Sequence, residues 1–133
     1  MTIRETILIV DDNPDDIEIT RIALEEAGRK ETLAAALRGE AALDMLRVAN
    51  GSLPSLILLD LKMPGMSGID TLRQIRADEH LKHIPVIVVT SSSLEADEQE
   101  AYDAGADCFL HKAFDIDQFG NNLNYLLERF VKS

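Results

Sequence analysis

Hydrophobic residues along this chain fall into short continuous runs separated by longer amphipathic stretches. A continuous apolar run of this kind is typical of a strand buried on both faces of a parallel sheet, because a strand with one wet face would alternate. The pattern therefore predicts strands at Ile7–Val10, Leu56–Leu59, Val86–Val89 and Cys108–Leu110.

The stretches between these runs carry the end signals of helices. Asn13–Ala27 begins with a capping asparagine, a proline at its first position and two aspartates in its first turn, and Gly28 suits its end. Three further helices are predicted: one through Ile69–Ile75, one over Ala96–Ala104, and a last one from Asp115, whose spacing to Gln118 resembles a capping box.

The segment Thr32–Leu46 fits two interpretations. Its alanine, leucine and glutamate residues favour a single helix by propensity alone. A short strand before Gly39 and a helix after it would instead keep strands and helices in strict alternation. We adopt the second interpretation, which brings the strands to five.

Strict alternation predicts a parallel sheet with right-handed crossovers and helices on both faces. In such sheets ligands bind beyond the carboxyl ends of the strands, where the strand order reverses. The residues that follow the four apolar runs are polar: Asp11 and Asp12, then Asp60, then Thr90 and Ser91, and finally Lys112. These positions meet at one edge of the sheet.

The residue types at this edge are those of metal-assisted phosphoryl transfer. Crowded carboxylates repel one another, and Mg²⁺ relieves that repulsion because it prefers oxygen ligands. A carboxylate such as Asp60 beside the cation can act as a nucleophile and form an aspartyl phosphate. Lys112 would place a positive charge on the phosphoryl group, and Thr90 would donate a hydroxyl hydrogen bond to it.

Each of these residues taken alone has a simpler explanation. Asp11 and Asp12 could cap the following helix, and Asp60 could be a turn residue. Thr90 could be an ordinary strand end, and Lys112 a solvated charge. The functional interpretation depends on all the strand ends considered together.

Four segments resemble the receiver domains of two-component response regulators: Ile9–Asn13, Leu58–Gly68, Val89–Ser91 and Lys112. The resemblance covers nearly the whole chain in the right order. It implies a flavodoxin-like, doubly wound, five-stranded parallel sheet of order 2-1-3-4-5, with one receiver domain over residues 1–133 and no output domain. Segments Val48–Pro54 and Thr90–Ser93 also resemble single-domain regulators that partner phytochrome-type kinases.

The resemblance implies a role for each matching residue. Asp60 would be the phosphoacceptor and a Mg²⁺ ligand. Asp12 would be the second direct ligand, and Asp11 would bind through water. Lys62 would contribute its backbone carbonyl to the metal, so its side chain would not be a ligand.

Thr90 and Lys112 would contact the phosphoryl group. Thr90 and Phe109 would switch together on phosphorylation, remodelling the face formed by the fourth helix, fifth strand and fifth helix. Phe109 could instead be an ordinary core residue.

One position departs from the family pattern. The family usually has proline after the active-site lysine, often with a cis peptide bond, and here Ala113 follows Lys112. A cis bond before alanine costs roughly 3 kcal/mol, against under about 1 kcal/mol before proline. The sequence leaves open whether the bond between Lys112 and Ala113 is cis or trans.

The composition indicates which kinds of binding partner suit this chain. The chain has 133 residues and a formal net charge of −11, so its surface repels nucleic acid and anionic membranes and suits a basic partner or a cation, although such a charge also serves solubility alone. Cys108 is the single cysteine, and the N-terminus lacks the features of a signal peptide, so a cytoplasmic location is expected.

The expected function is signal transduction by phosphorelay, with a sensor histidine kinase upstream and a downstream protein or phosphotransfer partner. Beyond its own phosphorylation and dephosphorylation, no enzyme activity is expected. The last helix could support a homodimer. Two alternative functions remain. A phosphatase of the haloacid-dehalogenase type would carry an acid where Lys62 stands. A pseudo-receiver would be an interaction module that is never phosphorylated.

Overall fold

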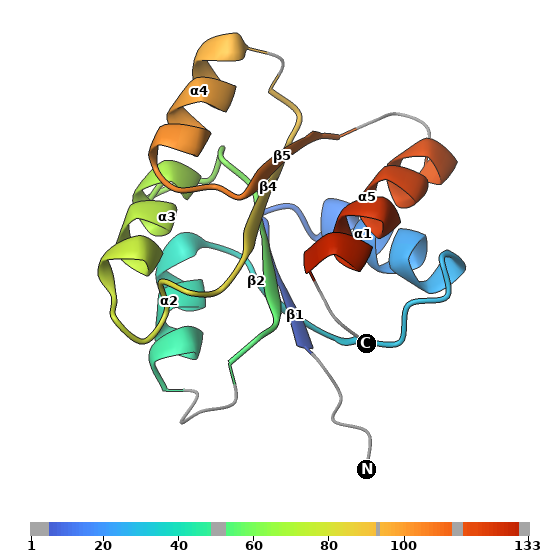
Figure 1. Cartoon of the computed structure of the whole chain (residues 1–133), viewed down its shortest axis with the longest axis horizontal. Helices are drawn as coiled ribbons and strands as arrows, with labels where there is room; N and C mark the ends of the chain where they lie inside the picture. The colour runs from blue at the N-terminus through green and yellow to red at the C-terminus, as the bar shows by residue number, and fades with distance from the viewer. Residues whose placement is uncertain (1–5, 49–52, 93, 113–115, 131–133) are drawn as a thin grey trace.

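The computed structural model describes residues 6–48, 53–92, 94–112 and 116–130. Strands and helices alternate along this part of the chain, as the sequence predicts (Figure 1). The strands are β1 (Thr6–Val10), β2 (Thr32–Ala36), β3 (Leu56–Leu59), β4 (Val86–Thr90) and β5 (Cys108–His111). The helices are α1 (Pro14–Glu26), α2 (Gly39–Arg47), α3 (Gly68–Ala77), α4 (Glu95–Asp103) and α5 (Ile116–Phe130).

The five strands form one parallel sheet in the order β2-β1-β3-β4-β5, which confirms the flavodoxin-like prediction. The strand order reverses at β1, which lies between β2 and β3. Continuous apolar runs suit the central strands because both faces of the sheet are covered. Every residue of β3 and β4 is buried, whereas the edge strands β2 and β5 are partly exposed.

Two hydrophobic clusters cover the two faces. Within a strand, alternate side chains enter opposite clusters: Ile7 and Ile9 join one cluster, and Leu8 and Val10 join the other. The first cluster holds residues of α1 and α5, and the second holds residues of α2, α3 and α4. Figure 1 shows the same division, with α1 and α5 on one side of the sheet.

The segment Thr32–Leu46, which fitted two interpretations, is a strand followed by a helix, and this confirms the interpretation we adopted. β2 ends at Ala36 and α2 begins at Gly39. A Cβ atom at Gly39 would lie only 2.0 Å from the Thr71 hydroxyl oxygen of α3, so any larger residue where these two helices meet would force the Thr71 side chain to shift. Tertiary packing therefore overrides the helical propensity of the alanine-rich stretch.

The predicted helix starts are confirmed where the structure describes them. Asn13 caps α1, since its side-chain oxygen accepts a hydrogen bond from the Asp15 amide at 2.9 Å. The expected start of α5 at Asp115 and the bond between Lys112 and Ala113 lie outside the described residues. None of the described helices is both long and apolar enough to cross a membrane.

Candidate functional site

The carboxyl ends of β1 and β3 position two aspartates side by side. The Asp11 amide donates to the Ala36 carbonyl at 3.0 Å, and the Asp60 amide donates to the Val10 carbonyl at 2.9 Å. The hydrogen-bonding pattern of the sheet thus extends one residue past each strand. Because the backbone of Asp60 is tied to the residue before Asp11, the two side chains emerge at the same edge.

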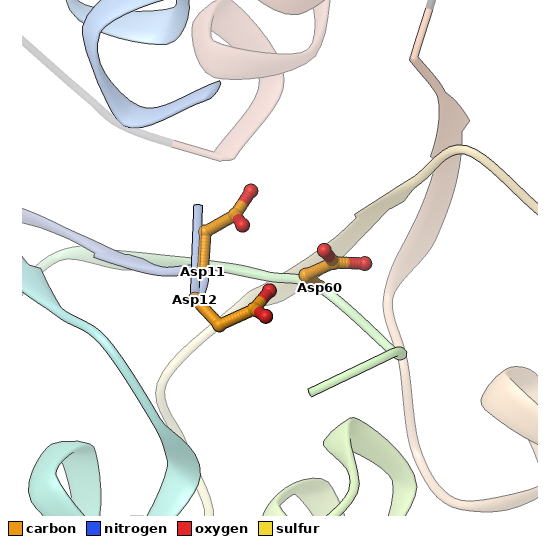
Figure 2. A group of neighbouring side chains, drawn as sticks. All are labelled: Asp11, Asp12 and Asp60. Atoms are coloured by element: carbon orange, nitrogen blue, oxygen red, sulfur yellow. The ribbon is translucent and has the colours of Figure 1, made fainter. Parts of the chain in front are cut away.

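Three carboxylates gather at this point. One oxygen from each of Asp11, Asp12 and Asp60 lies within 4.8 Å of the others (Figure 2). Asp11 and Asp60 are buried, with exposed fractions of 5% and 8%, whereas Asp12 is exposed. One member of the cluster therefore faces water, and a cation could approach from that side.

The turn after β1 orients Asp11. Its Oδ1 atom accepts a hydrogen bond from the Asn13 amide at 3.0 Å. The helix cap itself is Asn13, so the simpler interpretation that Asp11 or Asp12 caps α1 is wrong. The second oxygen of Asp11, Oδ2, lies beside a positively charged side chain.

That cation is the Lys112 ammonium, which reaches the cluster from the end of β5. The Lys112 amide donates to the Thr90 carbonyl at 2.8 Å, which continues the pairing of β5 with β4. The Nζ atom lies 2.8 Å from Asp11 Oδ2 and 3.2 Å from Asp60 Oδ2. The two buried aspartates therefore share one positive charge.

The pKa values of these groups reflect that sharing. Burial raises the pKa of Asp11 above its ordinary value, although hydrogen bonds from Lys112 and Asn13 act in the opposite direction. Burial alone would lower the pKa of Lys112, but hydrogen bonds to Asp11 and Asp16 and the charge of Asp60 raise it above its ordinary value. Lys112 is therefore a permanent cation at neutral pH.

The donor set suits a hard divalent metal ion. Carboxylate oxygens are the ligands that Mg²⁺ and Mn²⁺ prefer, and a few of them suffice because Mg²⁺ keeps several waters. Burial of Asp11 beside Asp60 is costly unless positive charge is nearby, and Lys112 supplies only one such charge. The cluster of Asp11, Asp12 and Asp60 can therefore bind a divalent cation.

The remaining predicted residues lie around this cluster. Thr90 is fully buried at the end of β4, where its hydroxyl oxygen accepts a 3.3 Å hydrogen bond from the Ser92 amide. The Lys62 amide donates to Asp60 Oδ1 at 3.4 Å, while its side chain is largely exposed. Phe109 is half-buried on β5 and packs against the cluster of α2, α3 and α4, which fits a core role as well as a switch.

Sequence reasoning missed one residue of this site. Asp16, in the first turn of α1, places its Oδ2 atom 2.8 Å from Lys112 Nζ. We assigned Asp16 only a favourable interaction with the helix dipole. Its contact with the lysine depends on the path of α1 and on the direction of the lysine side chain, and neither follows from local sequence.

Known proteins are similar to this chain in both sequence and fold. The chain matches the family model "Response regulator receiver domain" over residues 7–124. It is 30% identical over 115 residues to the polar-differentiation response regulator DivK of Brucella ovis, an alignment that covers 86% of this chain and 89% of DivK.

Solved structures of response regulators are also similar, among them two named for a phytochrome or bacteriophytochrome. The phosphorylated cyanobacterial phytochrome response regulator RcpA has a TM-score of 0.88 at 31% identity, covering 98% of this chain and 96% of RcpA. The bacteriophytochrome response regulator AtBRR has a TM-score of 0.81 at 34% identity, covering 99% and 97%. The Mn²⁺-bound form of the regulator Rcp1 has a TM-score of 0.84 at 28% identity, covering 97% and 96%.

Proposed function

The chain belongs to the response regulator receiver domain family of two-component signalling, and from that premise we propose that Asp60 accepts a phosphoryl group from a histidine kinase. The observation that carries the proposal is the convergence of Asp60, Asp11 and Asp12 on one point, with Lys112 Nζ 3.2 Å from Asp60 Oδ2. A nucleophilic carboxylate, acidic metal ligands and a fixed cation are the groups that phosphoryl transfer to an aspartate requires.

The chemistry follows from these positions. A carboxylate oxygen of Asp60 forms a bond to phosphorus while the bond from phosphorus to the kinase histidine nitrogen breaks. Lys112 stabilises the negative charge of the phosphoryl oxygens from the β5 side, and the Thr90 hydroxyl donates a hydrogen bond to one of them.

We assign Mg²⁺ as the metal, with Asp12 and Asp60 as direct ligands, Asp11 as a ligand through water, and the Lys62 carbonyl completing the set. When bound, Mg²⁺ neutralises charge on the phosphoryl oxygens. The similar regulator Rcp1 has been solved in a Mn²⁺-bound form, which supports the binding of a divalent ion.

The output in this proposal is contact with another protein. Thr90 and Phe109 change position on phosphorylation, and the surface of α4, β5 and α5 changes with them. The similarity to RcpA and AtBRR favours a phytochrome-type kinase as the upstream partner. In this proposal residues 1–133 form one receiver domain, which acts in the cytoplasm.

Phosphorylation by a small-molecule donor tests the proposal directly. The protein is incubated with acetyl phosphate and Mg²⁺, and its intact mass is measured. We expect one phosphoryl adduct on the wild type, none on Asp60→Asn, and an unchanged adduct on Asp44→Asn, which removes an exposed carboxylate of α2.

An unlabelled wild type, under conditions that label a known receiver, would show that the chain is a pseudo-receiver. An adduct that persists in Asp60→Asn would place the acceptor on another residue. Either result contradicts the assignment of Asp60.

A further inference from the structure

The Lys112 ammonium contacts three carboxylates from three different elements. Its Nζ atom lies 2.8 Å from Asp11 Oδ2, 2.8 Å from Asp16 Oδ2 and 3.2 Å from Asp60 Oδ2. An ammonium group has three N–H donors, so each carboxylate can take one. The lysine is held at the ends of β1 and β3 and by the first turn of α1.

Asp16 differs from the other two carboxylates. Asp11 and Asp60 belong to the cluster that can hold a metal, together with Asp12, whereas Asp16 does not. Among the described residues, the ion pair that its side chain makes is with Lys112. Asp16 therefore contacts the lysine without contributing to the metal cluster.

The packing around Lys112 shows why its contact with Asp16 helps to orient the lysine side chain. Lys112 and Asp16 line a small cavity of about 50 Å³ together with Ile19, Thr20 and Phe119. Apolar packing does not fill this side of the lysine, so packing alone leaves its side chain some freedom. The ion pair with Asp16 supplies a directional constraint there.

The electrostatic consequence concerns the metal. An uncompensated ammonium repels a divalent cation and competes with it for the oxygens of Asp11 and Asp60. Asp16 takes one of the three donors of Lys112 and offsets part of its charge. Removing the charge of Asp16 strengthens the competition from the lysine, and this effect adds to the small loss of attractive field that removing any nearby carboxylate, such as Asp15, would cause.

We propose that Asp16 is a positioning residue that holds one N–H donor of the Lys112 ammonium and offsets part of its charge, so that the lysine competes less with Mg²⁺ for Asp11 and Asp60. The proposal rests on the metal site of the proposed function. It adds Asp16 as a residue that tunes the Mg²⁺ affinity of that site. Asp16 acts through Lys112, so the effect of Asp16 depends on the presence of the lysine.

Calorimetric titration with Mg²⁺ tests this dependence. We expect Asp16→Asn to weaken Mg²⁺ binding about tenfold, since it removes a unit charge close to the site. Asp15→Asn is the matched control, because it removes the same charge from the neighbouring, exposed position of α1, and we expect a change below about twofold there. Asp16→Glu keeps the charge and should restore most of the affinity.

The same substitutions in a Lys112→Ala background isolate the coupling. There the loss caused by Asp16→Asn should fall to that caused by Asp15→Asn, because no lysine remains to be held. A circular dichroism spectrum and a thermal unfolding curve for each variant show that the comparison is made between folded proteins.

The outcomes separate this inference from the proposed function. Equal losses for Asp16→Asn with and without Lys112, or no loss at all, would overturn the role of Asp16 and leave phosphorylation of Asp60 untouched. The expected titration pattern without any acetyl phosphate adduct would overturn the function and retain the role of Asp16. A wild type that binds no Mg²⁺ would overturn both the metal assignment and the inference.

Discussion

The hydroxyl group of Ser92 donates a hydrogen bond to the carboxylate of Asp97, which joins the loop after β4 to the first turn of α4. Asp97 Oδ2 also lies 3.9 Å from Lys62 Nζ, in the loop after β3. Ser92 and Lys62 each stand two residues after a site residue, Thr90 and Asp60 respectively. Asp97 therefore connects α4 to the loop after Asp60 and to the loop after Thr90.

The first prediction is that Asp97→Ala uncouples α4 from events at Asp60. Without the carboxylate, Ser92 and Lys62 lose their shared partner, so a movement of either loop is no longer transmitted to the helix. Amide NMR shifts measured with and without beryllofluoride, which mimics an aspartyl phosphate, should show α4 shift changes reduced by about half or more, since coupling between two sites is typically worth only about 1 to 3 kcal/mol. Shift changes at Asp11 and Asn13 should persist.

Asp103→Ala provides the control for Asp97→Ala. It removes the same charge from the opposite end of α4, where Asp103 pairs with Gln99 on the same helix. Its α4 shift changes should match those of the wild type. Wild-type α4 responses in Asp97→Ala would show that the signal reaches the helix by another route.

The second prediction concerns the stability that Lys112 contributes before any metal binds. Lys112→Ala leaves Asp11, Asp16 and Asp60 without their common cation, and we expect the free energy of unfolding in EDTA to fall by about 2 to 4 kcal/mol. Mg²⁺ should still bind to this variant and should raise its stability more than that of the wild type, because the cation replaces the missing positive charge. Urea unfolding with and without Mg²⁺ measures both effects.

Lys82→Ala is the matched control for Lys112→Ala. Lys82 pairs with exposed Glu79 on the surface, where an ion pair contributes under about 1 kcal/mol. A Lys112→Ala protein that unfolds in EDTA like the Lys82→Ala protein would mean that the three aspartates do not depend on the lysine.

Sequence reasoning succeeded where a local pattern has one structural solution. The continuous apolar runs of β3 and β4, in alternation with helices, favour strands of a parallel sheet, and the residues after them then meet at one edge. This reasoning located Asp11, Asp12, Asp60 and Lys112. The alanine-rich strand β2 was harder, because its residues favour a helix and only packing of the sheet makes them a strand.

The sequence did not predict contacts between polar side chains of elements that are far apart along the chain. Asp16 and Lys112 are 96 residues apart, and their contact depends on how α1 leaves β1 and on the rotamer of the lysine. Asp97 likewise meets Lys62 only because α4 begins beside the loop after β3. Hydrophobic periodicity contains no information on such pairs.

The third prediction places a stability determinant at the opposite edge of the sheet. The Arg76 guanidinium of α3 donates to the carbonyls of Gly105 and Ile84 at 2.9 and 2.8 Å and to Asp107 Oδ2 at 2.9 Å. Arg76→Ala removes the donor that these acceptors share, although Asp107 Oδ2 keeps the hydrogen bond from the Val86 amide at 2.8 Å. We expect the free energy of unfolding to fall by about 3 kcal/mol, with Mg²⁺ affinity unchanged.

Arg73→Ala is the matched control for Arg76→Ala. Arg73 lies on the same helix, and its contact is a 3.7 Å ion pair with exposed Asp70. Its removal should cost under about 1 kcal/mol in the same urea titration. A loss of Mg²⁺ affinity in Arg76→Ala would refute the separation of the stabilising contacts from the functional edge.

The fourth prediction concerns the glycine that begins α3. Gly68 donates its amide to the Leu61 carbonyl at 2.9 Å, and a Cβ atom at Gly68 would lie 2.1 Å from the Asp60 carbonyl oxygen and 2.6 Å from Leu61 Cα. Both atoms belong to the backbone, so the chain beside the phosphoacceptor must shift to admit a methyl group. We expect Gly68→Ala to cost about 3 kcal/mol of unfolding free energy and to weaken Mg²⁺ binding, because Asp60 moves with its own backbone.

Gly120→Ala separates this steric effect from the general effect of replacing a helical glycine. At Gly120, in α5, the nearest atom to an added Cβ is Ala23 Cβ at 3.4 Å, which is an ordinary contact. Alanine favours a helix by up to about 1 kcal/mol over glycine, so Gly120→Ala should leave stability unchanged or raise it, with Mg²⁺ affinity intact. If Gly68→Ala behaved in the same way, the close approach of α3 to Asp60 would not be what positions the carboxylate. A loss of both stability and Mg²⁺ affinity in Gly68→Ala alone would show that the missing side chain at Gly68 is a requirement of the site itself.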